Sequence, residues 1–217
     1  MTAVPKRDRR TASLVAAVLL MIAGLTYSSW VLEFVLDTGL NPINSFLSEL
    51  DAEGRRFREV FDIADKITGT IVLVAALLGL WLFPRRKLVV TGWVALAVFG
   101  ASTIADASFP LETGPTEPSG LFPQLHHVHA LTSTLAVFGI FVAMIAFTLA
   151  SHRYRILPVL RHAGLWVLIG VSLATAWMLI GDNLPGDTGL GIAQRIQVGL
   201  MSAWLIILGA VVRCWRA

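Results

Sequence analysis

Residues 106–134, DASFPLETGPTEPSGLFPQLHHVHALTST, separate two long apolar segments of the chain. Four prolines interrupt this stretch, and a proline inside a helix removes a backbone hydrogen bond, so its middle cannot be helical. Asp106 closes the apolar segment before this loop, and His126, His127 and His129 open the segment after it. If both segments span a membrane, the acid and the three histidines must lie on the same membrane face.

The composition indicates a membrane protein. Of the 217 residues, 56% are hydrophobic and 14% are charged, whereas soluble domains carry roughly 25% charged residues. The net charge of +3 does not indicate nucleic-acid binding, because the basic residues flank apolar segments. The single cysteine, Cys214, excludes an intramolecular disulfide and a thiolate metal cluster.

Hydropathy predicts an all-α fold, a polytopic bundle of transmembrane helices in one domain. A span needs about 20 apolar residues, and six segments meet this length. They cover about 11–36, 60–83, 88–109, 125–150, 159–181 and 193–213. We expect the first to be retained, because it is longer than the roughly 7–15 apolar residues of a signal peptide.

The charge distribution predicts the orientation. Of the 17 lysines and arginines, 12 lie at the two termini or in loops 84–87 and 151–162. Basic residues concentrate on the cytoplasmic side, so both termini are expected in the cytoplasm of a multi-pass cell-membrane protein. All the acids except Asp8 lie on the other side or in the adjacent helix turns, which makes the outer face the candidate working face.

The histidines at the start of the fourth span are candidate metal ligands. His126 and His129 are three residues apart and share a helix face. With a carboxylate from Asp106, Glu49 or Asp182 they could hold a divalent metal, although the pattern is not that of a known metal motif. The alternatives are a polar site without metal, or histidines that cap loop carbonyls in the membrane interface.

Asp106 and Arg195 are the charged residues that most need partners. An ionisable residue within a span is costly and usually faces the bundle interior, and Arg195 faces the positive end of the last helix. We expect Arg195 to neutralise Asp106 or Glu49, or alternatively to bind an anionic substrate or headgroup. Ser48 is either a nucleophile or, more simply, a polar turn residue.

Four segments resemble a known family. They are LSELDAEGRRFREVFDIADKITGTI (47–71), FPLE (109–112), HHVHALTSTLAVF (126–138) and GLGIAQRIQVG (189–199). They are similar to the bacterial membrane proteins grouped as domain-of-unknown-function family 998, and more distantly to the eukaryotic family of damage-regulated autophagy modulators. The resemblance implies a six-helix fold without an established activity, and the eukaryotic relatives hint at lipids.

The resemblance also aligns individual residues with family motifs. Ser48 and Glu49 match a Ser-Glu-Leu motif, and Glu112 stands where an aspartate is usual after Phe-Pro. His127 matches the histidine that opens the fourth span, and Arg195 matches the arginine that opens the last.

Three functions follow as hypotheses. The first is a lipid-binding, lipid-handling or accessory protein that holds a lipid headgroup in a polar outer cavity. The second is an intramembrane lipid hydrolase, and the third a proton-coupled transporter. The candidate catalytic residues are His127, Asp106, Ser48 and Glu49. The candidate substrate-binding residues are Arg195, Glu112 and Asp182. We expect the lipid bilayer to surround the protein, and the sequence predicts no oligomeric state.

The orientation can be tested with reporter fusions. A reporter that is active only outside the cytoplasm should be inactive when fused after Ala217 and active when inserted in the loop 110–124. Activity of the fusion after Ala217 would contradict the predicted topology.

Overall fold

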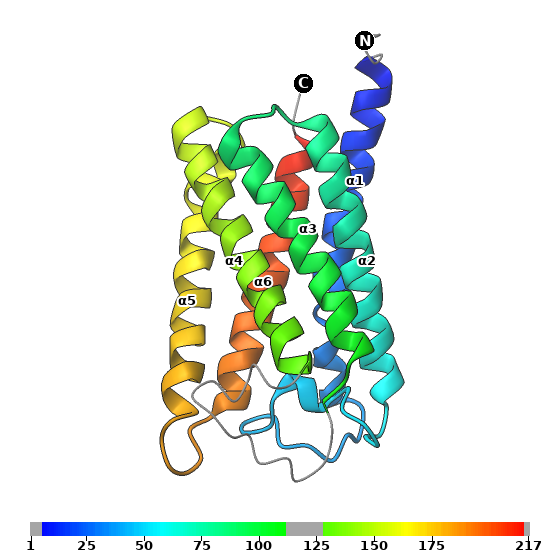
Figure 1. Ribbon diagram of the computed structural model, residues 1–217, viewed down its shortest axis with the longest axis vertical. Coiled ribbons are helices and arrows are strands. Elements are labelled where there is room, and N and C mark those ends of the chain that lie inside the picture. Colours follow the sequence, from blue (N-terminus) through cyan, green and yellow to red (C-terminus); the bar gives the residue numbers. More distant parts are fainter. Residues whose placement is uncertain (1–5, 112–127, 215–217) are drawn as a thin grey trace.

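The computed structural model describes residues 6–111 and 128–214, and six long helices make up most of this part of the chain. These helices are α1 Lys6–Thr26, α2 Arg58–Leu82, α3 Lys87–Ser108, α4 Val128–Tyr154, α5 Ala163–Gly181 and α6 Leu190–Arg213 (Figure 1). Each is long and apolar enough to cross a membrane, and the described residues form no strand. The predicted all-α, six-span fold is therefore confirmed.

Short 3-10 helices follow or precede some spans. The first α-helix ends at Thr26 and is followed by the 3-10 helix η1, Ser29–Phe34. The hydroxyls of Thr26 and Ser28 donate to carbonyls of the preceding turn, which weakens the regular α-helical bonding there. The 3-10 helix η2, Leu47–Glu49, lies in the first loop, and η4, Pro158–Arg161, precedes α5.

Consecutive helices pack side by side. The helices α1 to α4 follow one another in this way, and α6 closes the bundle against α1. The apolar stretch of α6 is 61% buried inside the bundle, whereas that of α5 is only 17% buried. The helix α5 lies at one edge of the bundle and packs mainly on α6 (Figure 1). Both ends of the chain lie at one end of the bundle. We call the opposite end, which carries the loops 35–57 and 182–189, the distal end.

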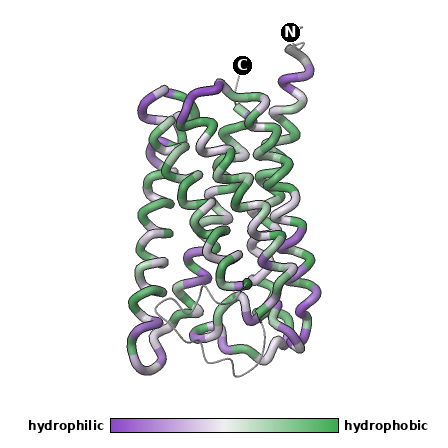
Figure 2. The backbone as a smooth tube through the Cα atoms, viewed as in Figure 1, coloured by the Kyte–Doolittle hydropathy of each residue, from purple (hydrophilic) through white to green (hydrophobic). Residues whose placement is uncertain are grey.

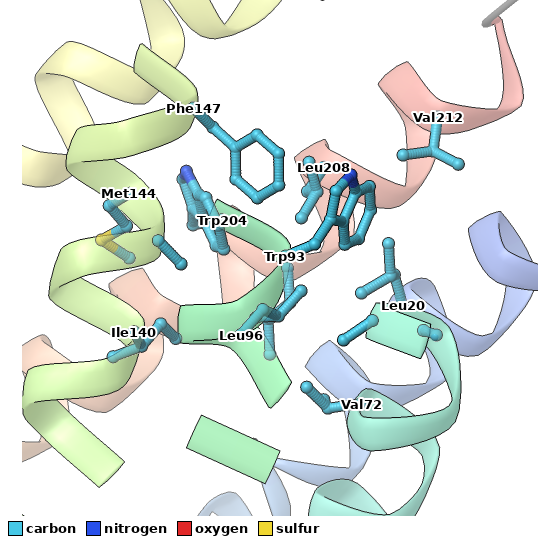
Figure 3. Packing of buried hydrophobic residues seen from close by; sticks show 14 of the residues in the cluster. Leu20, Val72, Trp93, Leu96, Ile140, Met144, Phe147, Trp204, Leu208 and Val212 are labelled. Atoms are coloured by element: carbon cyan, nitrogen blue, oxygen red, sulfur yellow. The ribbon is translucent and has the colours of Figure 1, made fainter. Parts of the chain in front are cut away.

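A row of aromatic rings joins the helices in the half of the core nearer the termini (Figure 3). Trp93 on α3 contacts Phe83 with ring centroids 5.3 Å apart and Phe147 of α4 at 4.9 Å. Phe147 in turn lies 6.2 Å from Trp204 of α6. Such offset and edge-on contacts stabilise buried aromatic clusters beyond their area alone.

The residues along the helices are mostly hydrophobic through the middle of the bundle and more hydrophilic toward its ends (Figure 2). Large side chains such as Trp166 and Leu173 are exposed on the membrane-facing side. Helices satisfy their own backbone groups, so such a surface is stable in hydrocarbon.

Glycines bring two spans into close contact. A Cβ atom on Gly100 of α3 would lie 2.7 Å from the carbonyl oxygen of Gly69 on α2, and one on Gly69 would lie 2.6 Å from that of Gly100. Small residues permit this backbone approach, which is a common basis of helix packing in membranes. The α2–α3 contact holds two walls of the site described next.

Candidate functional site

A polar cavity of about 100 Å³ lies in the distal half of the bundle. We call it the distal cavity. Its walls come from five of the six spans or their adjoining turns, and α5 contributes none of the residues. The lining residues are Tyr27, Ser29, Trp30, Leu47, Ser48, Leu50, Asp51, Phe61, Asp65, Thr103, Asp106, Ser133, Ala136, Val137, Gln194, Gln197 and Val198.

Three aspartates face this cavity from three segments. Asp51 belongs to the loop before α2, Asp65 to α2 and Asp106 to the last turn of α3. On α2, Lys66 pairs with Asp62 at 2.7 Å, as their four-residue spacing predicts. This pairing commits the lysine to Asp62 and leaves Asp65 on the wall of the cavity.

Asp106 is the centre of a hydrogen-bond cluster between α3 and α4. Its Oδ1 atom accepts hydrogen bonds from the hydroxyls of Thr132 and Ser133, both at 2.7 Å. The Nδ1 atom of His129 lies 3.3 Å from the same oxygen and 3.0 Å from the carbonyl oxygen of Phe109. The expected convergence of Asp106 with the start of the fourth span is therefore present, through His129.

Two buried polar atoms of the lining lack a hydrogen-bond partner within the described part of the chain. They are the Oδ1 atom of Asp51, an acceptor, and the Nε1 atom of Trp30, a donor. Asp51 is only 6% exposed. Burial raises the pKa of the Asp51 carboxyl to about 6; His129 opposes this rise, and the charge of Asp106 adds to it. A buried acceptor without a partner is costly, and a bound ligand or water would relieve that cost.

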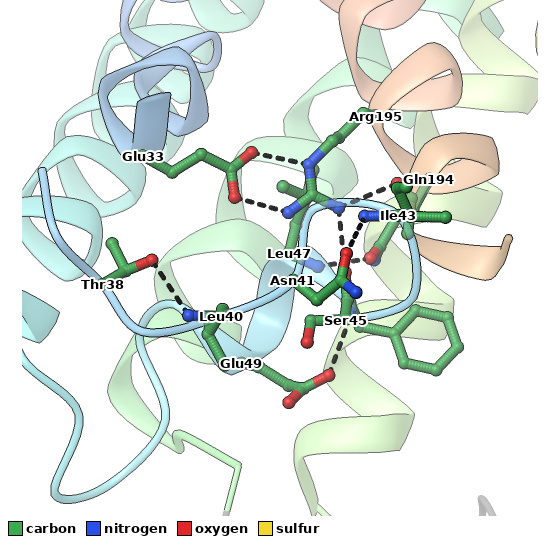
Figure 4. A network of polar contacts seen from close by, with 12 residues as sticks. Glu33, Thr38, Leu40, Asn41, Ile43, Ser45, Leu47, Glu49, Gln194 and Arg195 are labelled. Carbon is green, nitrogen blue, oxygen red and sulfur yellow. Dashed lines mark hydrogen bonds and ion pairs between the residues drawn. The ribbon is translucent and has the colours of Figure 1, made fainter. Parts of the chain in front are cut away.

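Arg195 is paired with Glu33, and the predicted partners Asp106 and Glu49 were wrong (Figure 4). Its Nε and Nη2 atoms donate to the two oxygens of the Glu33 carboxylate, each at 2.6 Å. The two residues are 6% and 7% exposed. The prediction failed because η1 turns Glu33 inward against α6, whereas the sequence places Glu33 at the outer end of a span.

Arg195 also connects the first loop to the start of α6 through hydrogen bonds. Its Nη1 atom donates to the carbonyl oxygen of Ser45 at 2.8 Å, and the amide of Leu47 donates to Oε1 of Gln194 at 2.6 Å. Gly191 permits this approach, because a Cβ atom there would lie 2.6 Å from the Ser45 carbonyl oxygen. Leu47 and Gln194 both line the distal cavity, so these bonds hold one of its walls in place.

The other predicted site residues are dispersed. Ser48 lines the distal cavity, but Glu49 caps η2 by accepting from the amide of Phe46 and does not line it. Asp182 is exposed at the end of α5. The remaining predicted residues, Glu112, His126 and His127, lie outside the described residues.

A metal centre is not assembled by the described residues alone. Within 6–111 and 128–214, no group of three or more His, Cys, Asp or Glu side chains is placed to hold a metal ion. His129, one half of the predicted ligand pair, directs its Nδ1 atom to Phe109 and Asp106. The other half, His126, lies outside the described part.

Sequence reasoning missed Asp51, Asp65 and Trp30. Asp51 stands in a loop rich in charges, and Asp65 stands near the start of the second apolar segment beside Lys66. The spacing in the sequence indicates that Asp65 is unusual, because Lys66 pairs with Asp62 four residues away and leaves Asp65 without a partner on its own helix. An acid left over in a span marks a functional position.

The buried pair predicts a large effect of replacing Arg195. In Arg195→Gln the Glu33 carboxylate stays buried without its partner, so the free energy of unfolding should fall by about 3–5 kcal/mol. The matched control is Arg56→Gln, because Arg56 pairs with Asp37 on the surface with side chains 65% and 79% exposed. An exposed pair contributes about 1 kcal/mol or less. Equal melting temperatures of the two variants in detergent would contradict the prediction.

Asp51 predicts a pH dependence of stability. Its folded pKa of about 6 exceeds the ordinary 3.8, so the folded state binds this proton more tightly than the unfolded state. The contribution of Asp51 to the free energy of unfolding is therefore fully present below about pH 4. It is lost as the pH rises through about 6, by up to about 3 kcal/mol. Asp51→Asn should remove this loss, and Asp37→Asn, at an exposed acid, should not. Thermal unfolding across this range tests it; a parent-to-Asp51→Asn difference that is constant with pH would contradict it.

Comparison with known proteins assigns the family. The family model described as "Protein of unknown function (DUF998)" matches residues 15–211, a range that includes all or most of each of the six helices. No curated protein and no solved structure matches the chain. The family match confirms the resemblance carried by the four sequence segments, and the chain belongs to the DUF998 family.

Proposed function

We propose that this protein binds the polar headgroup of a membrane lipid in the distal cavity and acts as a lipid-binding or lipid-handling module. The observation that carries the proposal is a pair of buried atoms on the wall of one cavity, Oδ1 of Asp51 and Nε1 of Trp30, which have no hydrogen-bond partner among the described residues. An acceptor and a donor in one polar cavity match a ligand that has both kinds of group.

The depth of the distal cavity supports a headgroup. Asp106 lies two residues from the end of α3, and Asp65 and Gln197 lie seven residues from the starts of α2 and α6. With a rise of 1.5 Å per residue, these positions are about 3–10 Å from the helix ends. Headgroups and their linkages occupy about the outer 5–8 Å on each side of the hydrocarbon, so the cavity extends from that layer to slightly below it.

The size of the cavity supports the tip of a headgroup as the bound part. Its volume of about 100 Å³ is smaller than the roughly 150 Å³ of an engineered cavity that holds benzene. A few non-hydrogen atoms fit such a space, and the acyl chains of the same lipid would remain in the bilayer beside the helices.

The geometry favours binding over hydrolysis. A serine nucleophile needs a base that accepts its proton, usually a histidine. Here the Ser133 hydroxyl donates to Asp106, and His129 directs its Nδ1 atom to Phe109 and Asp106. This arrangement fixes the three side chains, and none of the described residues supplies an imidazole base to Ser133.

A proton-coupled transporter receives less support than a binding module. A proton pathway would need ionisable residues at several depths of the bundle. In the described part of the chain, the acids within the spans lie toward the distal end, except for Asp8 at the start of α1. With both termini in the cytoplasm, the distal cavity would face the outside of the cell membrane.

Lipid retention tests the proposal. The protein is purified from membranes that contain phosphatidylethanolamine, phosphatidylglycerol and phosphatidylcholine, and retained lipid is measured by native mass spectrometry. Ala136→Phe introduces a ring into the distal cavity, because Ala136 lines it and is 6% exposed. We expect the parent protein to retain about one lipid per chain, and Ala136→Phe to lose it.

Leu135→Phe is the matched control. Leu135 adjoins Ala136 on α4 but is 41% exposed on the membrane-facing side, so its larger ring leaves the cavity unchanged. This control should retain lipid like the parent protein. Equal retention by both variants, with both folded as judged by gel filtration, would show that lipid does not bind in the distal cavity.

A further inference from the structure

We infer that the group bound in the distal cavity is an ammonium group, of the phosphoethanolamine class or of a free small amine. Only the assignment of this ammonium group to a lipid rests on the proposed function. It follows from three features of the cavity: its charge, its unpartnered atoms and its aromatic walls.

The lining is rich in carboxyl groups. Asp51, Asp65 and Asp106 face the cavity, and no lysine or arginine is among the lining residues of the described part. Nearby cations are bonded to other groups: Lys66 pairs with Asp62, and Arg195 pairs with Glu33. The Nε atom of Arg58 donates to the backbone carbonyl oxygen of Asp51 at 3.0 Å. The segment 112–127 contains no lysine or arginine in its sequence.

Grouped carboxylates in a low-dielectric interior repel one another, and they also repel an anion such as a phosphate or carboxylate. A cation would reduce this repulsion and compensate the cost of burying the acids. His129 lies beside Asp106, but its Nδ1 atom is directed to Asp106 and Phe109 rather than to Asp51 or Asp65.

The unpartnered atoms favour an amine over a simple ion. The Oδ1 atom of Asp51 is an acceptor on a side chain that is 6% exposed, and a primary ammonium provides three donors. The Nε1 atom of Trp30 is a donor, which suits an oxygen near the amine, as in phosphoethanolamine. A metal ion fits less well, because the described residues contain no group of three or more ligands placed to hold one.

The aromatic walls add to the same preference. Tyr27 and Trp30 line the cavity together with Phe61. Aromatic faces attract cations, most strongly where water is excluded. A quaternary ammonium would gain from these rings but has no N–H group for Asp51, so a primary amine should bind more tightly than choline-bearing lipids.

Binding of short-chain lipids to the purified full-length protein tests the inference. The probes are dihexanoyl phosphatidylethanolamine, the corresponding phosphatidylcholine and phosphatidylglycerol, and free ethanolamine. We expect the ethanolamine lipid to bind about ten-fold or more tightly than the other two lipids, as a charge-assisted hydrogen bond implies. Asp51→Asn and Asp65→Asn should each abolish this preference, and Asp37→Asn, at an exposed acid, should leave it intact.

The outcomes separate this inference from the lipid proposal. Binding of free ethanolamine without binding of any lipid, if lost in Asp51→Asn and Asp65→Asn, would support the ammonium site and overturn the lipid source. Binding of phosphatidylglycerol as tight as that of phosphatidylethanolamine, if lost in Ala136→Phe, would overturn the ammonium site and leave the lipid proposal standing. An unchanged preference in both folded aspartate variants would also overturn the ammonium site. Failure of every probe to bind would overturn both.

Discussion

The pair formed by Glu33 and Arg195 is the interaction on which the distal half of the structure depends. Both side chains are almost fully buried, and both oxygens of the carboxylate receive a hydrogen bond from the guanidinium. Burying two charges is costly, and only this two-bond geometry with further hydrogen bonds offsets the cost. The pair joins the first span to the last across 162 residues of chain. It also orients Arg195 so that its remaining nitrogen holds the loop at Ser45.

Pairing Arg195 with Glu33 separates the charges of the distal half into two groups. One group is the neutral pair of Glu33 and Arg195, which connects the first span to the last. The other consists of Asp51, Asp65 and Asp106, which surround the distal cavity with no lysine or arginine among the described lining residues. If Arg195 had paired with Asp106, as its position at the start of the last span suggests, one of these three carboxyl groups would have had a guanidinium partner. Because Arg195 pairs with Glu33, it neutralises none of the three carboxyl groups of the cavity.

Much of the fold follows from the sequence, because the length and hydropathy of each apolar segment dictate a span regardless of its neighbours. The convergence of Asp106 with the start of α4 follows as well, since a loop joins the two helices. The partner of Arg195 could not be predicted, because η1 breaks the first helix and turns Glu33 inward. The burial of Asp51 depends on the loop packing over the cavity, which local hydropathy does not contain.

If the distal cavity binds a lipid headgroup as proposed, its position within one half of the bundle determines which leaflet supplies that lipid. The opposite half of the core holds the aromatic row from Phe83 to Trp204, and the cavity lies on the distal side of this row. Such a headgroup would come from the leaflet on the distal side. The protein would respond to the lipid composition of that single leaflet, and movement of a lipid between leaflets would change its occupancy even when the total amount of that lipid is constant.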